Sequence, residues 1–184
     1  MNALADGNLE ACLKPNRRVA VLHDHEGVRR HHGEICPLNP AKVRRYGPVQ
    51  RSGTVLGERS AHPDKTAVVF DGREITYRAM NDRINQMAGV LTCDLGVRPG
   101  DRVAYLLPNC PELLELYYAV QKIGAVAVPL NYKLIPREVA YLVNASGAEV
   151  LVFASQFAAS VAEAAQSFTS DVALVSAGGE CPAR

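Results

Sequence analysis

The sequence has no tryptophan, few aromatic residues and no long apolar run. A membrane-spanning helix needs about 20 consecutive apolar residues. The longest early apolar run, Val19 to Leu22, is also far shorter than the apolar core of a secretion signal. We therefore expect neither a membrane span nor a secretion signal within the 184 residues.

Strong charge and paired cysteines are also missing. The net charge is +1, and residues 1 to 50 carry eight Lys and Arg residues against five acids, an excess too small to indicate nucleic-acid binding. The five cysteines are odd in number, scattered and without a CxxC pair, so they indicate neither a disulfide framework nor a zinc site. These features favour a cytoplasmic protein that does not bind nucleic acid.

The common motifs of catalysis are missing as well. No GxGxxG follows a predicted strand, and no GxxxxGKS, GxxxxGKT, GxSxG or HExxH occurs. We interpret two carboxylate pairs, Glu112 with Glu115 and Asp82 with Glu74, as solvated acids of helix first turns and hairpins rather than as acid/base pairs. Cys110 stands at a predicted helix start but has no identifiable histidine partner. We predict no catalytic residue and no metal site among these positions.

Residues 1 to 50 have no readable periodicity and are interrupted by four prolines. We interpret them as a mostly disordered extension. Four of the five histidines lie here, in the stretch HDHEGVRRHH, where flexible ligands separated by two arginines make a poor metal site. A solvated tail is the preferred interpretation, and a metal-binding histidine-rich tail is the alternative. The four residues are His23, His25, His31 and His32.

The most regular stretch is 101–131, where a helical pattern separates two apolar runs. Val103 to Leu107 and Ala125 to Leu130 do not alternate polar with apolar residues, which is typical of strands covered on both faces of a parallel sheet. Between them Leu116, Val120 and Ile123 recur at helical spacing, and Glu115 falls on the opposite, polar side. The pattern predicts a right-handed βαβ unit.

Further elements surround this unit. Asp71-Gly72 between two β-prone runs predicts a hairpin, because both turn residues tolerate positive φ. Strands that alternate with helices predict an open α/β sheet. The fold class is therefore α/β, with a partial open, mostly parallel sheet, helices on both faces and an N-terminal β-hairpin. The expected elements are strands 66–70 and 74–76, a helix from Tyr77 to Leu95 capped by Thr76, a helix 136–146 ended by Gly147, strand 150–153, a helix capped by Ser155, and strand 172–175.

The segments HPDKTAVVFDGREITYRAM, DRVAYLLPNCPELLELYYAVQKIGAVAVPLN and PREVAYLVNASGAEVLVF occur in this order. Together they resemble the N-terminal part of acyl-adenylate-forming (AMP-binding) enzymes, especially acyl-CoA synthetases, the acid-CoA ligases. The resemblance covers about Thr54 to Gly179. Within it, ITYRAM and QKIGAVAVPLN are similar to two family signatures. The second signature ends in Asn131, as the corresponding signature does in similar ligases that act on carboxylic or fatty acids.

The resemblance implies ATP, magnesium and coenzyme A as cofactors of the complete enzyme, which forms an acyl-adenylate and then an acyl-CoA. It also implies a Ser/Thr/Gly-rich phosphate loop followed by Lys, later acidic residues and a mobile C-terminal domain. None of these is present in residues 51 to 184, which we assign to the N-terminal part of the AMP-binding domain, ending before the phosphate loop. We expect this fragment to be inactive alone and to bind no cofactor tightly.

One position carries a ligand expectation from the resemblance. Lys133 stands where several CoA ligases place a basic residue that reaches the phosphates of coenzyme A. A lysine gives a point charge rather than a bidentate fork, and a solvated loop lysine is the alternative interpretation. Lys133 is the one cofactor-binding candidate.

Other roles stay open at this point. The chain could be a truncated copy of a ligase or one piece of a split enzyme that associates with a complementing C-terminal fragment. It could also be a non-catalytic binding or assembly module, because an incomplete sheet exposes an apolar edge that favours self-association.

Overall fold

The computed structural model describes residues 19–23, 27–29 and 62–177. They form two compact units. The first contains the described residues of 1–35 together with 101–108 and 126–177, and the second contains 62–100 and 109–125. None of the helices in the described residues is long and apolar enough to cross a membrane.

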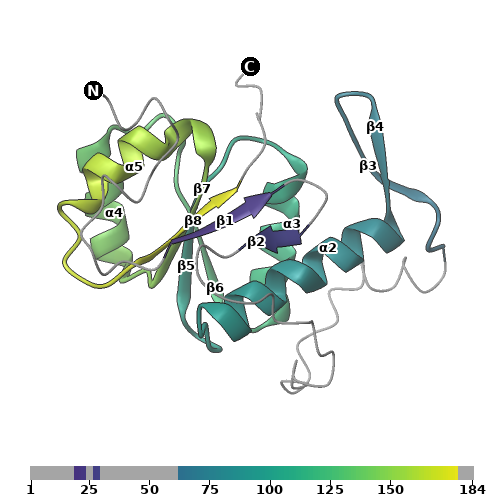
Figure 1. Ribbon diagram of the computed structural model, residues 1–184, viewed down its shortest axis with the longest axis horizontal. Coiled ribbons are helices and arrows are strands. Elements are labelled where there is room, and N and C mark those ends of the chain that lie inside the picture. Colours follow the sequence, from purple (N-terminus) through teal and green to yellow (C-terminus); the bar gives the residue numbers. More distant parts are fainter. Residues whose placement is uncertain (1–18, 24–26, 30–61, 178–184) are drawn as a thin grey trace. The chain divides into compact units, whose positions relative to one another are not determined.

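The first unit is built on a six-stranded sheet (Figure 1). Five neighbouring strands are parallel, and β2 pairs antiparallel with β1 at one edge. The predicted parallel sheet is confirmed, with strand ends shifted by one or two residues. In spatial order the strands are β2 (Gly27–Arg29), β1 (Val19–His23), β8 (Ala173–Ala177), β7 (Val150–Ala154), β5 (Arg102–Leu106) and β6 (Val126–Pro129).

Two of these strands lie within residues 1 to 50, the range that the sequence predicts to be a mostly disordered extension. The VAVL run forms most of β1, and a second short strand, β2, follows it. The rest of this range, including His25, His31 and His32, lies outside the described residues.

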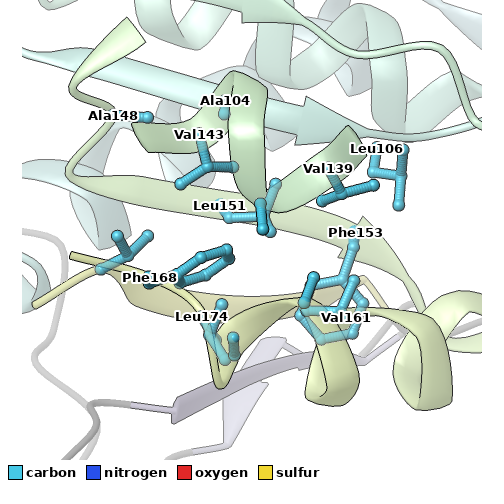
Figure 2. Packing of buried hydrophobic residues seen from close by; sticks show 14 of the residues in the cluster. Ala104, Leu106, Val139, Val143, Ala148, Leu151, Phe153, Val161, Phe168 and Leu174 are labelled. Carbon is cyan, nitrogen blue, oxygen red and sulfur yellow. The ribbon is translucent and has the colours of Figure 1, made fainter. Parts of the chain in front are cut away.

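Helices α4 (Pro136–Ser146) and α5 (Ala158–Ala165) cover one face of the sheet. Figure 2 shows their apolar side chains packed against those of β5, β7 and β8. Burying one large apolar side chain contributes about 1.5–3 kcal/mol, so this cluster is the main source of stability in the unit. Its labelled members include Leu106, Val139, Val143, Leu151, Phe153, Val161, Phe168 and Leu174.

The ends of α4 agree with the sequence prediction. Gly147 has φ 64° and ends the helix in the left-handed conformation, which glycine adopts at little cost. At the start, Glu138 Oε2 accepts a hydrogen bond from the Ile135 N–H at 3.1 Å. Isoleucine has no side-chain oxygen, so only this half of a capping box forms.

The start of α5 differs from the prediction. Ser155 begins a one-turn 3₁₀ helix, η3 (Ser155–Phe157), and α5 begins only at Ala158. No side-chain cap hydrogen bond forms at either start. The expectation that Ser155 caps the helix was therefore wrong.

The second unit contains a hairpin and two helices. Strands β3 (Thr66–Phe70) and β4 (Arg73–Thr76) pair antiparallel. Asp71 and Gly72 at the turn have φ of 46° and 74°, so the predicted Asp-Gly hairpin is confirmed. Thr76 caps α2 (Tyr77–Gly89) by accepting a hydrogen bond from the Ala79 N–H at 3.2 Å.

The predicted continuous helix from Tyr77 to Leu95 changes character after α2. A π-helical turn, η2 (Val90–Asp94), follows it. Within this turn the Thr92 hydroxyl donates a hydrogen bond to the Ala88 carbonyl at 2.8 Å, and such bonds compete with the regular helical pattern. The unit is completed by α3 (Pro111–Lys122).

Candidate functional site

The carboxyl ends of β5, β6, β7 and β8 lie at one edge of the parallel sheet. Strand β6, which follows β5 in the sequence, pairs with β5 on one side. Strand β7, the next in the sequence, pairs with β5 on the opposite side. Ligands of open α/β sheets bind at the carboxyl ends of the strands, where the direction of strand addition reverses. This edge is therefore the candidate site of the first unit.

The turn after β6 presents Lys133 at this edge. The Leu130 N–H donates to the Tyr105 carbonyl at 2.9 Å, which continues the pairing of β6 with β5. The side chain of Asn131 then accepts the N–H of Lys133 at 3.0 Å, and its carbonyl accepts the N–H of Leu134 at 3.1 Å. Asparagine commonly fixes turns in this way, so Asn131 holds the backbone beside the exposed Lys133.

An aromatic contact holds the same turn from the side of β7. The rings of Tyr132 and Phe157 are stacked, with centroids 6.2 Å apart and an interplanar angle of 27°. Both are half-buried. Because Phe157 belongs to η3, the contact joins the segment after β6 to the segment after β7. The backbone carrying Lys133 is thus fixed by a hydrogen bond and by packing.

The chemistry available at this edge is limited. Lys133 supplies a positive charge, and the exposed Ser155 and Gln156 supply uncharged polar groups after β7. Among residues 62–177 no group of three or more His, Cys, Asp or Glu side chains could hold a metal ion. The described side chains therefore do not fit the magnesium ion that the family resemblance implies, and the edge can bind an anion only weakly.

A charged cluster joins α2 to α3 in the second unit. Arg83 Nε lies 2.7 Å from Glu115 Oε1, and Arg83 Nη2 lies 3.2 Å from Glu112 Oε1. Lys122 also donates a hydrogen bond to the side chain of Asn85. These contacts pair opposite charges between two packed helices, so their role is structural.

Glu115 corrects the sequence prediction that both Glu112 and Glu115 are solvated. Glu115 is only 4% exposed, because it lies on the face of α3 that packs on α2, where Arg83 neutralises it. No local pattern links residues 83 and 115, so their pairing could not be found from the sequence. Asp82 and Glu74 are exposed as predicted.

Cys110 precedes α3 and is 6% exposed. It makes no side-chain cap hydrogen bond and is not part of a disulfide. A nucleophilic thiol needs access to its substrate as well as a lowered pKa. Its burial therefore favours a packing role.

Comparison with known proteins gives the family. The family model described as "AMP-binding enzyme" matches residues 58–183. The crotonobetaine/carnitine--CoA ligase of Salmonella paratyphi B is 40% identical over 99 residues, which are 51% of this chain and 19% of the ligase. The chain thus spans about a fifth of the length of the curated relatives it matches.

Solved structures agree with this relationship. A fatty acyl CoA synthetase of Mycobacterium tuberculosis is 33% identical with a TM-score of 0.60, covering 67% of this chain and 25% of that one. The N-terminal domain of FACL13, also from M. tuberculosis, is 32% identical with a TM-score of 0.61, covering 67% of this chain and 32% of that one. The resemblance inferred from the sequence signatures is confirmed: the chain belongs to the AMP-binding enzyme family, and its relatives are acyl-CoA ligases.

Proposed function

We propose that residues 58–183 form the N-terminal part of the AMP-binding domain of an acid-CoA ligase. Such an enzyme activates a carboxylic or fatty acid with ATP and transfers the acyl group to coenzyme A. The observation that carries the proposal is the family match over this range, together with relatives that are themselves CoA ligases. The parallel sheet from β5 to β8 is the scaffold that this segment contributes.

The catalytic groups of the reaction lie outside this chain. Stabilising the charge that develops on a reacting phosphate requires several donors and a cation converging on one point. The sequence contains no glycine-rich phosphate loop followed by lysine, and the described residues hold no metal-binding cluster. We therefore propose that residues 1 to 184 alone form no acyl-adenylate, and that ATP, magnesium and coenzyme A are cofactors of a complete enzyme.

Titration of the purified chain with Mg²⁺ and ATP tests this division of roles. We expect no saturable heat in calorimetry, which corresponds to a dissociation constant of about 1 mM or weaker. A complete fatty acyl CoA synthetase measured in parallel provides the positive control. Saturable one-to-one binding in the micromolar range would show that a phosphate-binding element exists in these residues.

Lys133 is the proposed contact for a phosphate of coenzyme A. Its backbone N–H is bonded to Asn131, and its side chain is exposed at the carboxyl edge of the sheet. A lysine ammonium is a compact, mobile charge that binds phosphate without fixed geometry. An exposed charge pair contributes only about 0.2–1 kcal/mol, so the contact positions the coenzyme rather than binding it tightly.

Substitution of Lys133 should weaken an already weak interaction with coenzyme A. In a ³¹P NMR titration we expect Lys133→Ala to reduce the affinity about two- to fivefold, and Lys133→Arg to preserve it. The effect should be smaller with dephosphorylated coenzyme and at high salt. Arg137→Ala removes another exposed cation and serves as the control. Equal affinities for the native chain and Lys133→Ala would assign Lys133 to the solvated surface.

A binding or assembly role is the second candidate. In the described residues β6 pairs only with β5, and Val126 on β6 is 48% exposed. Unpaired strand edges favour association with another chain. The partner would be a second copy or a complementing C-terminal fragment, and sedimentation of the chain as a monomer at every concentration would count against the second-copy alternative.

A further inference from the structure

Strand β1 occupies an unexpected place in the sheet. It lies at residues 19–23, outside the family match at 58–183, yet it pairs in parallel with β8 near the other end of the chain. Figure 1 shows the two strands, purple and yellow, side by side. Val19, Ala20, Val21 and Leu22 are in register with Leu174, Val175, Ser176 and Ala177 respectively.

The order of the neighbouring strands indicates which kind of strand is expected at the position of β1 in the sheet. β5, β7 and β8 follow one another outward in the sheet and also in the sequence. A further parallel strand that continued this progression would pair with the outer edge of β8, because consecutive βα units usually add to neighbouring positions. β1 holds that position, although it is supplied by a segment that precedes the whole progression.

The outer edge of β8 needs a partner strand. All five residues of β8 are buried, and buried backbone N–H and C=O groups must be hydrogen-bonded. An unpaired apolar edge would pair with another chain. The VAVL run of β1 has the uninterrupted apolar pattern of a central parallel strand. Among the described residues β2 ends the sheet, and a strand of only three residues discourages further pairing.

We propose that the outer edge of β8 is a strand-binding surface that accepts an extended apolar segment in parallel register. In this chain its own β1–β2 pair occupies the surface. The occupant of the surface is therefore this chain's own strand, and no other strand can pair with this edge of β8 while β1 is in place. The inference rests on the pairing of the sheet and does not depend on the proposed ligase function.

The backbone geometry predicts which amides report on this pairing. The Ala173 N–H donates to the Glu149 carbonyl at 2.9 Å, on the β7 side. Because N–H groups alternate along a strand, Val175 also faces β7, whereas Leu174 and Ser176 face β1. Removing β1 should therefore expose the amides of Leu174 and Ser176 and leave Val175 protected.

Hydrogen exchange of the full chain and of a variant lacking residues 1–30 tests this pattern. In the variant we expect the amides of Leu174 and Ser176 to exchange roughly tenfold faster or more, while Val175 and the amides of β7 stay slow. A labelled peptide of residues 17–30 should bind the variant, restore slow exchange and fail to bind the full chain. A peptide of scrambled sequence should do neither.

A point substitution covers the case in which the deletion unfolds the unit, which fast exchange in β7 would reveal. Ala20→Pro removes an N–H donor that faces β8, and Ala20→Gly keeps it as the matched control. Ala20→Pro should expose the Leu174 and Ser176 amides selectively. The proposal is overturned by fast exchange of these amides in the full chain, by unchanged exchange after either disruption of β1, or by equal binding of the scrambled peptide.

Discussion

Replacing Arg83 with alanine should lower the free energy of unfolding by about 3–5 kcal/mol, because it leaves the buried Glu115 carboxylate without its counter-charge. Glu115 is 4% exposed, and Arg83 Nε lies 2.7 Å from its Oε1. Denaturant unfolding followed by circular dichroism measures the change. A loss of this size is a large part of the roughly 5–15 kcal/mol that stabilises a typical domain.

Two further variants separate charge burial from other causes. The double variant Arg83→Met with Glu115→Leu should recover most of the loss, since an apolar pair of similar volume often replaces a buried ion pair without cost. Arg78→Ala removes an ion pair with Asp64 in which the two side chains are 57% and 79% exposed, and it should change stability far less than Arg83→Ala because solvent screens the pair. Equal losses for Arg83→Ala and Arg78→Ala would contradict the structural role assigned to the cluster.

Replacing Phe153 with alanine should destabilise the first unit by about 3–5 kcal/mol, because it removes a large side chain and leaves a cavity between β7 and the helices. Phe153 has no exposed surface and packs in the cluster of Figure 2. Urea unfolding measures the loss, with Val69→Ala as a surface control in the second unit. Val69 is 65% exposed, so its truncation should change stability by no more than about 0.5 kcal/mol.

A milder change keeps this prediction testable if the alanine variant does not fold. Phe153→Leu retains most of the apolar volume, and we expect it to cost more than the Val69 control but less than Phe153→Ala. A Phe153→Leu variant as stable as the native chain, together with a folded and equally stable Phe153→Ala, would show that the cluster contributes little to the unit.

The elements specified by local signals were predictable from the sequence. Asp71-Gly72 identified the hairpin, Thr76 the start of α2, and Gly147 the end of α4, because each acts on its immediate neighbours. The apolar runs of β5 and β6 were sufficient to predict that these two strands are parallel neighbours. Such signals involve turn and cap geometry over three or four residues, and they apply wherever the segment is placed.

Features that depend on distant residues were not predictable. The helical pattern places Glu115 on the polar face of its helix. Its partner Arg83 is 32 positions away, and no residue near Glu115 in the sequence indicates that the two will pair. The pairing of β1 with β8 joins residues about 150 positions apart, and the apolar run of β1 alone does not identify its neighbour. Such contacts depend on the tertiary arrangement rather than on local propensity.

The candidate site was predictable only in part. Lys133 was identified through the family resemblance, and its chemistry alone does not distinguish it from other surface lysines. The structure adds the hydrogen bond from its N–H to Asn131 and the stacking of Tyr132 on Phe157. The hydrogen bond to Asn131 joins residues two positions apart. The ring contact joins residues 25 positions apart, so it could be found only once the fold was known.

ATP–pyrophosphate exchange by the purified 184-residue chain is the most direct test of the proposal that these residues are a scaffold segment and lack the catalytic groups. The assay would use Mg²⁺, ATP and a panel of short-chain, long-chain and aromatic carboxylic acids, with a complete acyl-CoA synthetase as the positive control. We predict no exchange above background with any acid, because the sequence contains no phosphate loop and the described residues contain no metal-binding cluster. Acid-dependent exchange by the chain alone would contradict this assignment.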